Sequence, residues 1–154
     1  MMFDAKLQVL IAEDDDGHAT LVRRNLKRAG IEELVHLRDG QELLDYVYRR
    51  AAWADRASHE SMVLVLDLNM PRLGGLDVLR VLRNDADRVP FPVFVLTTTD
   101  NPAEIYRCYS LGAAACLVKP VDYGAFGGMI QRLGAFLVAS VLPGEHRPSG
   151  VVDQ

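Results

Sequence analysis

Five short apolar runs, each followed by a segment of helical spacing, constrain the fold of this sequence more than any other feature. The runs have the length of strands and are LQVLIA (7–12), LVHL (34–37), MVLVLD (62–67), FPVFVLT (91–97) and AACLV (114–118). The following segments carry apolar residues every three or four positions and begin near Gly17, Asp39, Gly75, Pro102 and Phe126. Strands that alternate with helices predict right-handed βαβ units and a parallel sheet.

The alternation predicts a doubly wound α/β fold with a flavodoxin-like, five-stranded parallel sheet of order 2-1-3-4-5 and helices on both faces. We expect residues 1–142 to form it as one domain, because a chain of this length buries about two-thirds of its unfolded surface. Residues 143–154 are rich in glycine, proline and charge and are predicted to be a disordered tail. Ligands bind outside the carboxyl ends of such strands, so the residues there are candidate site residues.

Capping patterns locate the starts of two helices. Asp16 is expected to be the N-cap of the first helix, and Asp39 that of the second. The apolar spacing of the second helix continues to Ala51, and Trp53 is expected to pin the following loop to this helix.

The strand ends place acidic residues beside one lysine. Glu13 and Asp14 follow the first run, Asp67 ends the third, and Lys119 follows the fifth. Two carboxylates about 4 Å apart repel by roughly 4 kcal/mol at an effective dielectric constant near 20, so three converging carboxylates require a cation. Hard oxygen ligands without histidine or thiol favour Mg²⁺, with Mn²⁺ as the alternative. The sequence therefore predicts a divalent-metal site suited to phosphoryl chemistry.

Charge and hydropathy exclude several classes of partner. The formal net charge is −4, which offers no basic surface for nucleic acid, and no apolar stretch is long enough to span a membrane. We therefore expect a cytoplasmic protein that binds neither nucleic acid nor membrane. The cysteines and histidines lack metal-binding spacing. The cysteines are interpreted as core thiols, with a redox pair as the alternative, and the histidines predict neither a metal site nor a phosphohistidine relay.

The motifs AEDDD, LVLDLNMPRLGG, VLTTT and LVKP stand in this order at the ends of the first, third, fourth and fifth runs. Together they resemble the receiver domain of two-component response regulators, over about residues 6 to 140. The long connection after the second helix, the TTT triplet and the lack of an output domain further resemble single-domain regulators paired with phytochrome histidine kinases. A sensor histidine kinase, with bacteriophytochromes as candidates, is the partner that this resemblance implies.

The resemblance implies a role for each site residue. Asp67 is the phosphoacceptor, which takes a phosphoryl group from a phosphohistidine of the kinase. Glu13 and Asp14 match the acidic pair, with Asp14 as a direct Mg²⁺ ligand and Glu13 acting largely through water. Asp67 itself and the backbone carbonyl of Asn69 complete the metal ligands, and Lys119 supplies a positive charge to a phosphoryl oxygen.

The threonine loop matches the switch segment of the family. Thr97 is the hydroxyl that moves to the phosphoryl group, and Thr98 lies beside it in the same loop. Asn69 and Thr99 occupy positions that influence access of the hydrolytic water. With no acid or amide at Thr99, we expect only Mg²⁺-dependent self-phosphorylation and slow self-dephosphorylation, and not a turnover enzyme.

Two further positions bear on the switch. Pro120 matches the family's cis-proline after the lysine. Cys116 departs from the pattern, because many receivers carry an aromatic residue there that changes rotamer on activation. Tyr106 and Tyr109 could supply another aromatic readout, although packing with the hydroxyl in water is the more ordinary role for them.

Other classes remain open at this stage. A degenerate receiver that acts as a phosphorylation-independent binding module would keep the fold and lose the chemistry. An aspartate-nucleophile phosphatase or phosphomutase would share the sheet and the metal, but Asn69 replaces the second acid of the DxD pattern. A nucleotide-binding flavodoxin-like protein is disfavoured because the first strand–helix turn is acidic.

The last helix carries more apolar residues than one sheet face requires. An excess apolar face marks a partner surface, so we expect a homodimer through this helix, the alternative being a tail that folds back on its own domain. The residues concerned are Phe136, Leu137, Val138, Val141 and Leu142.

Overall fold

The computed structural model confirms the predicted fold and describes residues 6–57, 61–88, 90–140 and 142. Five parallel strands form one sheet in the order β2-β1-β3-β4-β5. The strands are β1 (Leu7–Ala12), β2 (Glu33–Leu37), β3 (Ser61–Asp67), β4 (Val93–Thr97) and β5 (Ala115–Val118). The helices are α1 (Asp16–Arg28), α2 (Gly40–Val47), α3 (Gly75–Asn84), α4 (Pro102–Ser110) and α5 (Tyr123–Ala139), with a 3₁₀ turn η1 (Ala51–Trp53).

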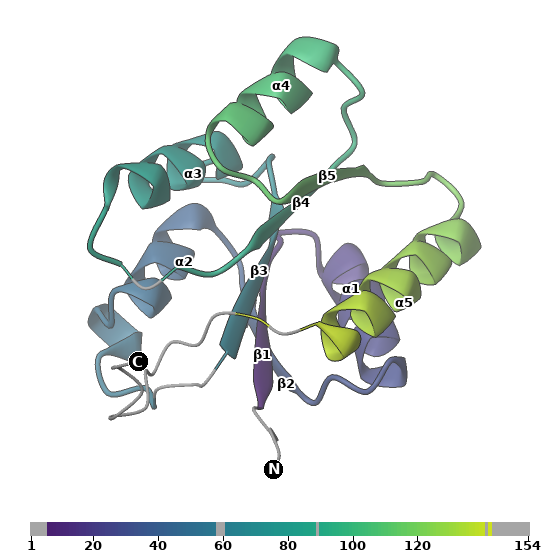
Figure 1. Cartoon of the computed structure of the whole chain (residues 1–154), viewed down its shortest axis with the longest axis horizontal. Helices are drawn as coiled ribbons and strands as arrows, with labels where there is room; N and C mark the ends of the chain where they lie inside the picture. The colour runs from purple at the N-terminus through teal and green to yellow at the C-terminus, as the bar shows by residue number, and fades with distance from the viewer. Residues whose placement is uncertain (1–5, 58–60, 89, 141, 143–154) are drawn as a thin grey trace, which may run out of the picture.

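Helices cover both faces of the sheet (Figure 1). In β1, Leu10 and Ala12 belong to a core cluster shared with α2, α3 and α4, whereas Val9 and Ile11 belong to a cluster shared with α1 and α5. Successive side chains of a strand point to opposite faces, so an unbroken apolar run serves two cores at once. This explains why the strands read as continuous apolar runs.

The N-cap of the first helix lies one residue earlier than predicted. Asp15, and not Asp16, is the N-cap of α1, and its carboxylate accepts the N–H of His18 at 3.0 Å. Asp15 has an extended backbone conformation, whereas Asp16 is the first helical residue and pairs with exposed Arg38. The prediction that Asp16 is the N-cap was therefore wrong. Asp15 and Asp16 have the same side chain, so residue type could not show which of them precedes the first helical residue.

The second helix is shorter than its apolar spacing predicts. It ends at Val47, and Arg49 and Ala51 have φ angles of 55° and 51°, in the left-handed region that ends a helix. Ala51 therefore lies in η1 and is exposed. Trp53 packs edge-on against Tyr46 of α2 with ring centroids 4.9 Å apart, which confirms that it pins this connection to the helix.

Only part of the surface predicted for dimerisation is exposed on α5. Phe136 and Val138 are 58% and 55% exposed. Leu137, predicted as part of that surface, lies in the core, and Leu142 is partly buried against it. Helical geometry accounts for this, because Leu137 shares a face with buried Leu133. Val141 and the tail at 143–154 lie outside the described residues.

Candidate functional site

Four polar residues lie at the carboxyl edge of the sheet. Glu13 follows β1, Asp67 ends β3, Thr97 ends β4 and Lys119 follows β5. All four residues are buried. Asp14, the fifth residue predicted here, is exposed. The parallel strand ends thus bring together residues that are distant in the sequence.

The carboxylates converge as predicted. Glu13, Asp14 and Asp67 each place an oxygen within 4.8 Å of the others. The Lys119 ammonium lies 2.8 Å from Glu13 Oε1 and 3.6 Å from Asp67 Oδ2. Lys119 therefore pairs most closely with Glu13, and not with Asp67 alone.

The environment of Glu13 disfavours its ionised form. Burial, followed by the hydrogen bond with Asp67, raises the pKa of Glu13 from 4.5 to about 7, while Lys119 acts in the opposite direction. One ammonium does not compensate the crowded carboxylates.

A divalent cation fits this donor set. Three carboxylates against the Lys119 ammonium leave two negative charges when all are ionised, and every ligand atom is a hard oxygen. Oxygen ligands of this kind suit Mg²⁺ or Mn²⁺. The cluster therefore has the chemistry of a divalent-metal site.

The loop after β3 is held by a close backbone approach. The Asn69 N–H donates to Asp67 Oδ1 at 3.2 Å, which orients the carboxylate. A Cβ at Gly75 would lie 2.7 Å from the carbonyl oxygen of Asp67 and 2.7 Å from Leu68 Cα. Only glycine allows α3 to begin this close to the end of β3.

An ion pair that the sequence analysis missed joins the same loop to α2. Arg72 has a φ angle of 65°, and its Nε and Nη2 donate to the two carboxylate oxygens of Asp39 at 2.9 and 3.1 Å. Asp39 also accepts the N–H of Glu42 at 2.8 Å, which confirms it as the N-cap of α2. This ion pair therefore joins the loop that follows Asp67 to the start of α2.

The threonine loop is internally hydrogen-bonded. Thr97 Oγ1 accepts the N–H of Thr99 at 3.1 Å, and the Thr97 carbonyl accepts the N–H of Lys119 at 2.7 Å. Thr98 is exposed and Thr99 is half-buried. Asp67 pairs with Leu96 in the β3–β4 register, and Thr97 is the next residue of β4.

Two histidines contact this site, and the sequence analysis did not place them there. His18 Nδ1 lies 3.0 Å from Lys119 Nζ, and because an ammonium only donates, the ring nitrogen accepts. His36 Nε2 lies 2.6 Å from the Glu13 carbonyl oxygen and donates to it. His36 is the second-last residue of β2, and this place near the carboxyl end of a predicted run is the signal that could have found it.

The prediction of a cis bond before Pro120 is wrong. The described residues contain no cis peptide bond, so Lys119 and Pro120 are joined in the trans form. The trans form of an X–Pro bond is the lower in free energy by about 0.5–1 kcal/mol.

Tyr109 does not have the ordinary packing role that was the alternative for it. The Tyr109 hydroxyl accepts the N–H of Cys116 at 3.0 Å, so it does not simply face water. Strand β5 lies at the edge of the sheet, and Tyr109 satisfies an N–H on its outer side. Cys108 is buried and Cys116 is partly buried, and burial raises the pKa of the Cys116 thiol to about 12. Both cysteines behave as core thiols, as predicted.

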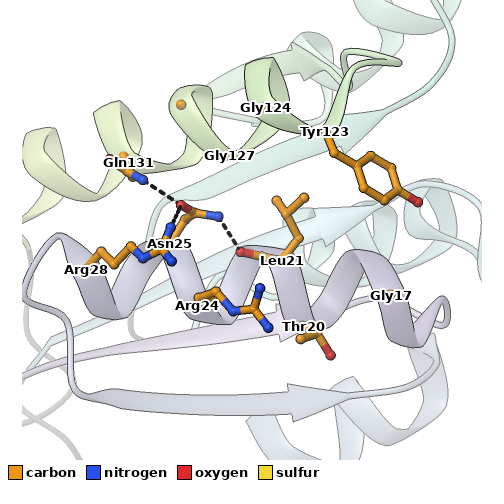
Figure 2. Close-up of a pocket in the computed structure, with 11 residues that line it drawn as sticks. Gly17, Thr20, Leu21, Arg24, Asn25, Arg28, Tyr123, Gly124, Gly127 and Gln131 are labelled. Atoms are coloured by element: carbon orange, nitrogen blue, oxygen red, sulfur yellow. Dashed lines mark hydrogen bonds between the residues drawn. The ribbon is translucent and has the colours of Figure 1, made fainter.

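A pocket of about 420 Å³ lies between α1 and α5. Figure 2 shows Arg24, Asn25 and Arg28 along α1, with Gln131 opposite them on α5. Asn25 Oδ1 accepts from Gln131 Nε2 at 2.6 Å, which joins the two helices. Tyr123 lies at the end of the pocket nearest the start of α1 (Figure 2).

The fold and the site together define a class of protein. A parallel sheet of order 2-1-3-4-5, with a carboxylate cluster, a threonine and a lysine at its carboxyl edge, is the architecture of a phosphoryl-accepting receiver domain. The chain belongs to the response regulator receiver domain family, whose sequence profile matches residues 9–131. Receiver domains are in general signalling modules and not enzymes.

Relatives agree with this assignment over nearly the whole chain. Response regulator Rcp1 of Synechocystis is 29% identical over 134 residues, or 86% of this chain and 90% of Rcp1. The Mn²⁺-bound crystal structure of Rcp1 superimposes with a TM-score of 0.81 and covers 90% of this chain and 99% of that one.

Two further solved structures are similar. The phosphorylated cyanobacterial phytochrome response regulator RcpA is 25% identical, with a TM-score of 0.81, and the match covers 90% of this chain and 99% of RcpA. Response regulator RPA3017 in red light signaling of R. palustris is 36% identical, with a TM-score of 0.75, covering 88% and 97%. None of the helices in the described part of the chain is long and apolar enough to cross a membrane.

Proposed function

We propose that Asp67 is the phosphoacceptor of this receiver domain. It is a buried carboxylate at the end of β3, oriented by the Asn69 N–H and faced by Lys119. This position is the observation that carries the proposal. One oxygen of Asp67 attacks the phosphorus of a phosphohistidine, and an acyl phosphate forms. The P–N bond breaks, and its electron pair stays on the imidazole nitrogen, which takes up a proton.

The metal is proposed to be Mg²⁺, with Mn²⁺ as a substitute. Asp14, Asp67 and the backbone carbonyl of Asn69 would hold it directly, and Glu13 through water. A bound divalent cation neutralises charge on the phosphoryl oxygens during transfer. Lys119, which pairs with Glu13 and Asp67, adds a second positive charge.

Phosphorylation then acts as a two-state switch of protein binding. Thr97 gives up its bond to the Thr99 N–H and turns to the phosphoryl group, which changes the loop between β4 and α4. Thr98 moves with this loop. Asn69 and Thr99 flank the path of the hydrolytic water, and since Thr99 is neither an acid nor an amide, self-dephosphorylation is slow.

The partner is proposed to be a histidine kinase of the phytochrome type in the cytoplasm. The support is that RcpA is a phytochrome response regulator and RPA3017 acts in red light signaling. A second partner is another copy of the chain, which would cover the exposed apolar side chains of Phe136 and Val138 on α5. Phe136→Asp should then lower the mass measured by light scattering, whereas Val81→Asp on α3 should not.

The first test is phosphorylation of the purified protein by acetyl phosphate on a phosphate-retarding gel. We expect a retarded band that requires Mg²⁺ and is absent in Asp67→Asn. Asp77→Asn, which removes an exposed carboxylate on α3, is the matched control and should behave as wild type. A folded wild-type protein that shows no band with saturating Mg²⁺ would instead be a phosphorylation-independent binding module.

A further inference from the structure

Lys119 has a partner that its proposed role in phosphoryl transfer does not use. Its ammonium lies 2.8 Å from Glu13 Oε1, 3.6 Å from Asp67 Oδ2 and 3.0 Å from His18 Nδ1. The lysine and its two carboxylate partners belong to the site described above. His18 stands on α1, one turn beyond the N-cap, and is neither a metal ligand nor a phosphoacceptor in the proposed mechanism.

The ring of His18 lies between the site and α5. It packs edge-on against Phe126 with centroids 5.6 Å apart, and against Tyr123 with centroids 6.2 Å apart, both at 81°. Phe126 is buried in the core shared by α1 and α5, whereas Tyr123 is 63% exposed. The His18 ring thus contacts the Lys119 ammonium through Nδ1 and packs edge-on against Tyr123 and Phe126 at the start of α5.

Arrival of a phosphoryl group changes the acceptors available to Lys119. A phosphoryl oxygen is an anionic acceptor, and charge-assisted hydrogen bonds are roughly twice as strong as those to neutral groups. His18 accepts through an uncharged ring nitrogen, whereas Glu13 is an acid that a bound divalent cation would keep ionised. The ring nitrogen of His18 is therefore the acceptor that the ammonium gives up to the phosphoryl oxygen.

We propose that His18 is a positioning residue that holds Lys119 before phosphorylation and, when released, transmits the event to Tyr123 at the start of α5. This inference deepens the proposed function and rests on it. In β5 this chain has Cys116 at the position where an aromatic side chain could change rotamer on phosphorylation. The contacts of His18 with Tyr123 and Phe126 offer a different aromatic pathway, on the other face of the sheet. Tyr123 also forms one end of the α1–α5 pocket, so its movement reshapes an exposed surface (Figure 2).

The test separates the two contacts of His18 with two variants. His18→Asn keeps an acceptor near the place of Nδ1 and removes the ring, whereas His18→Phe keeps a ring and removes the acceptor. Each protein is labelled with 3-fluorotyrosine and followed by fluorine NMR, with the five signals assigned by single Tyr→Phe changes. Mg²⁺ with beryllofluoride serves as the phosphoryl mimic, and the signal of Tyr106 on α4 reports separately on the opposite face of the sheet.

The expected result is a shift of the Tyr123 signal in wild type on adding the mimic, and loss of that shift in both variants. In ¹⁵N-histidine-labelled wild type, the Nδ1 resonance of His18 should move toward that of a free imine nitrogen. Both variants should still give the retarded band with acetyl phosphate, which shows that they fold and accept phosphate.

The inference is overturned if Tyr123 responds in either variant as it does in wild type, or if the Tyr123 signal or the His18 Nδ1 resonance does not respond in wild type. Failure of the proposed function is recognised separately, because wild type would then give no retarded band. Asp67→Asn should show neither the band nor the Tyr123 shift.

Discussion

Replacement of Glu13 by glutamine should stabilise the metal-free protein at high pH. The pKa of Glu13 is raised from 4.5 to about 7 by burial and by Asp67, so between these values the folded state binds more protons than the unfolded state. Stability therefore falls as pH rises through this window, and the cost is complete above pH 7. Glu13→Gln keeps the shape and an acceptor for Lys119 while removing the charge.

The size of the effect follows from the two pKa values. From pH 5 to pH 8, the free energy of unfolding of Glu13→Gln relative to wild type should rise by roughly 2 to 3 kcal/mol, at about 1.36 kcal/mol per unit of the pKa shift that lies in this interval. The change belongs to the Glu13–Asp67 pair as a whole. Urea denaturation in EDTA at both pH values measures it, and Glu33→Gln, which removes an exposed carboxylate, controls for net charge.

Added Mg²⁺ provides a second arm of the same experiment. A metal that binds the carboxylates must displace the proton held at Glu13, so the stabilisation of wild type by Mg²⁺ should grow from pH 6 to pH 8. In Glu13→Gln this growth should be smaller. A difference between the two proteins that stays flat from pH 5 to pH 8 in EDTA would refute the assignment of a raised pKa to Glu13.

Two further substitutions test the loop geometry and the edge of the sheet. Gly75→Ala should cost about 1–3 kcal/mol of stability in urea and slow phosphorylation, because its Cβ would lie 2.7 Å from the Asp67 carbonyl, whereas Gly74→Ala, whose nearest contact is 3.5 Å, should cost less. Equal costs would contradict the close-approach argument. Tyr109→Phe should cost about 1 kcal/mol and speed hydrogen exchange at the Cys116 amide, and an unchanged exchange rate would show that the hydroxyl does not protect it.

The strands and most of the site were predictable from the sequence for one physical reason. A strand buried on both faces must be a continuous apolar run, so its end is visible as the first polar residue. Glu13, Asp67, Thr97 and Lys119 are such residues, and the parallel sheet places them at one edge. Their convergence follows from topology and needs no knowledge of side-chain packing.

The contacts that the sequence analysis missed depend on side-chain reach and backbone angles. Lys119 and His18 are 101 residues apart, and their contact depends on where the first turn of α1 points. Arg72 reaches Asp39 from a left-handed backbone position that arginine seldom adopts, so its residue type gave no signal. The choice of N-cap between adjacent aspartates was decided by φ and ψ alone.

The site is connected to the two faces of the sheet by different residues. Thr97 leads through its loop to α4 on one face, whereas Lys119 leads through His18 to Tyr123 on the other. The Thr97 carbonyl accepts the backbone N–H of Lys119, but neither His18 nor its aromatic contacts take part in that bond, so loss of the His18 contact should leave the response of α4 intact. The fluorine signal of Tyr106 should therefore respond equally to beryllofluoride in wild type and in both His18 variants. A parallel loss at Tyr106 would show that the routes are coupled within the protein.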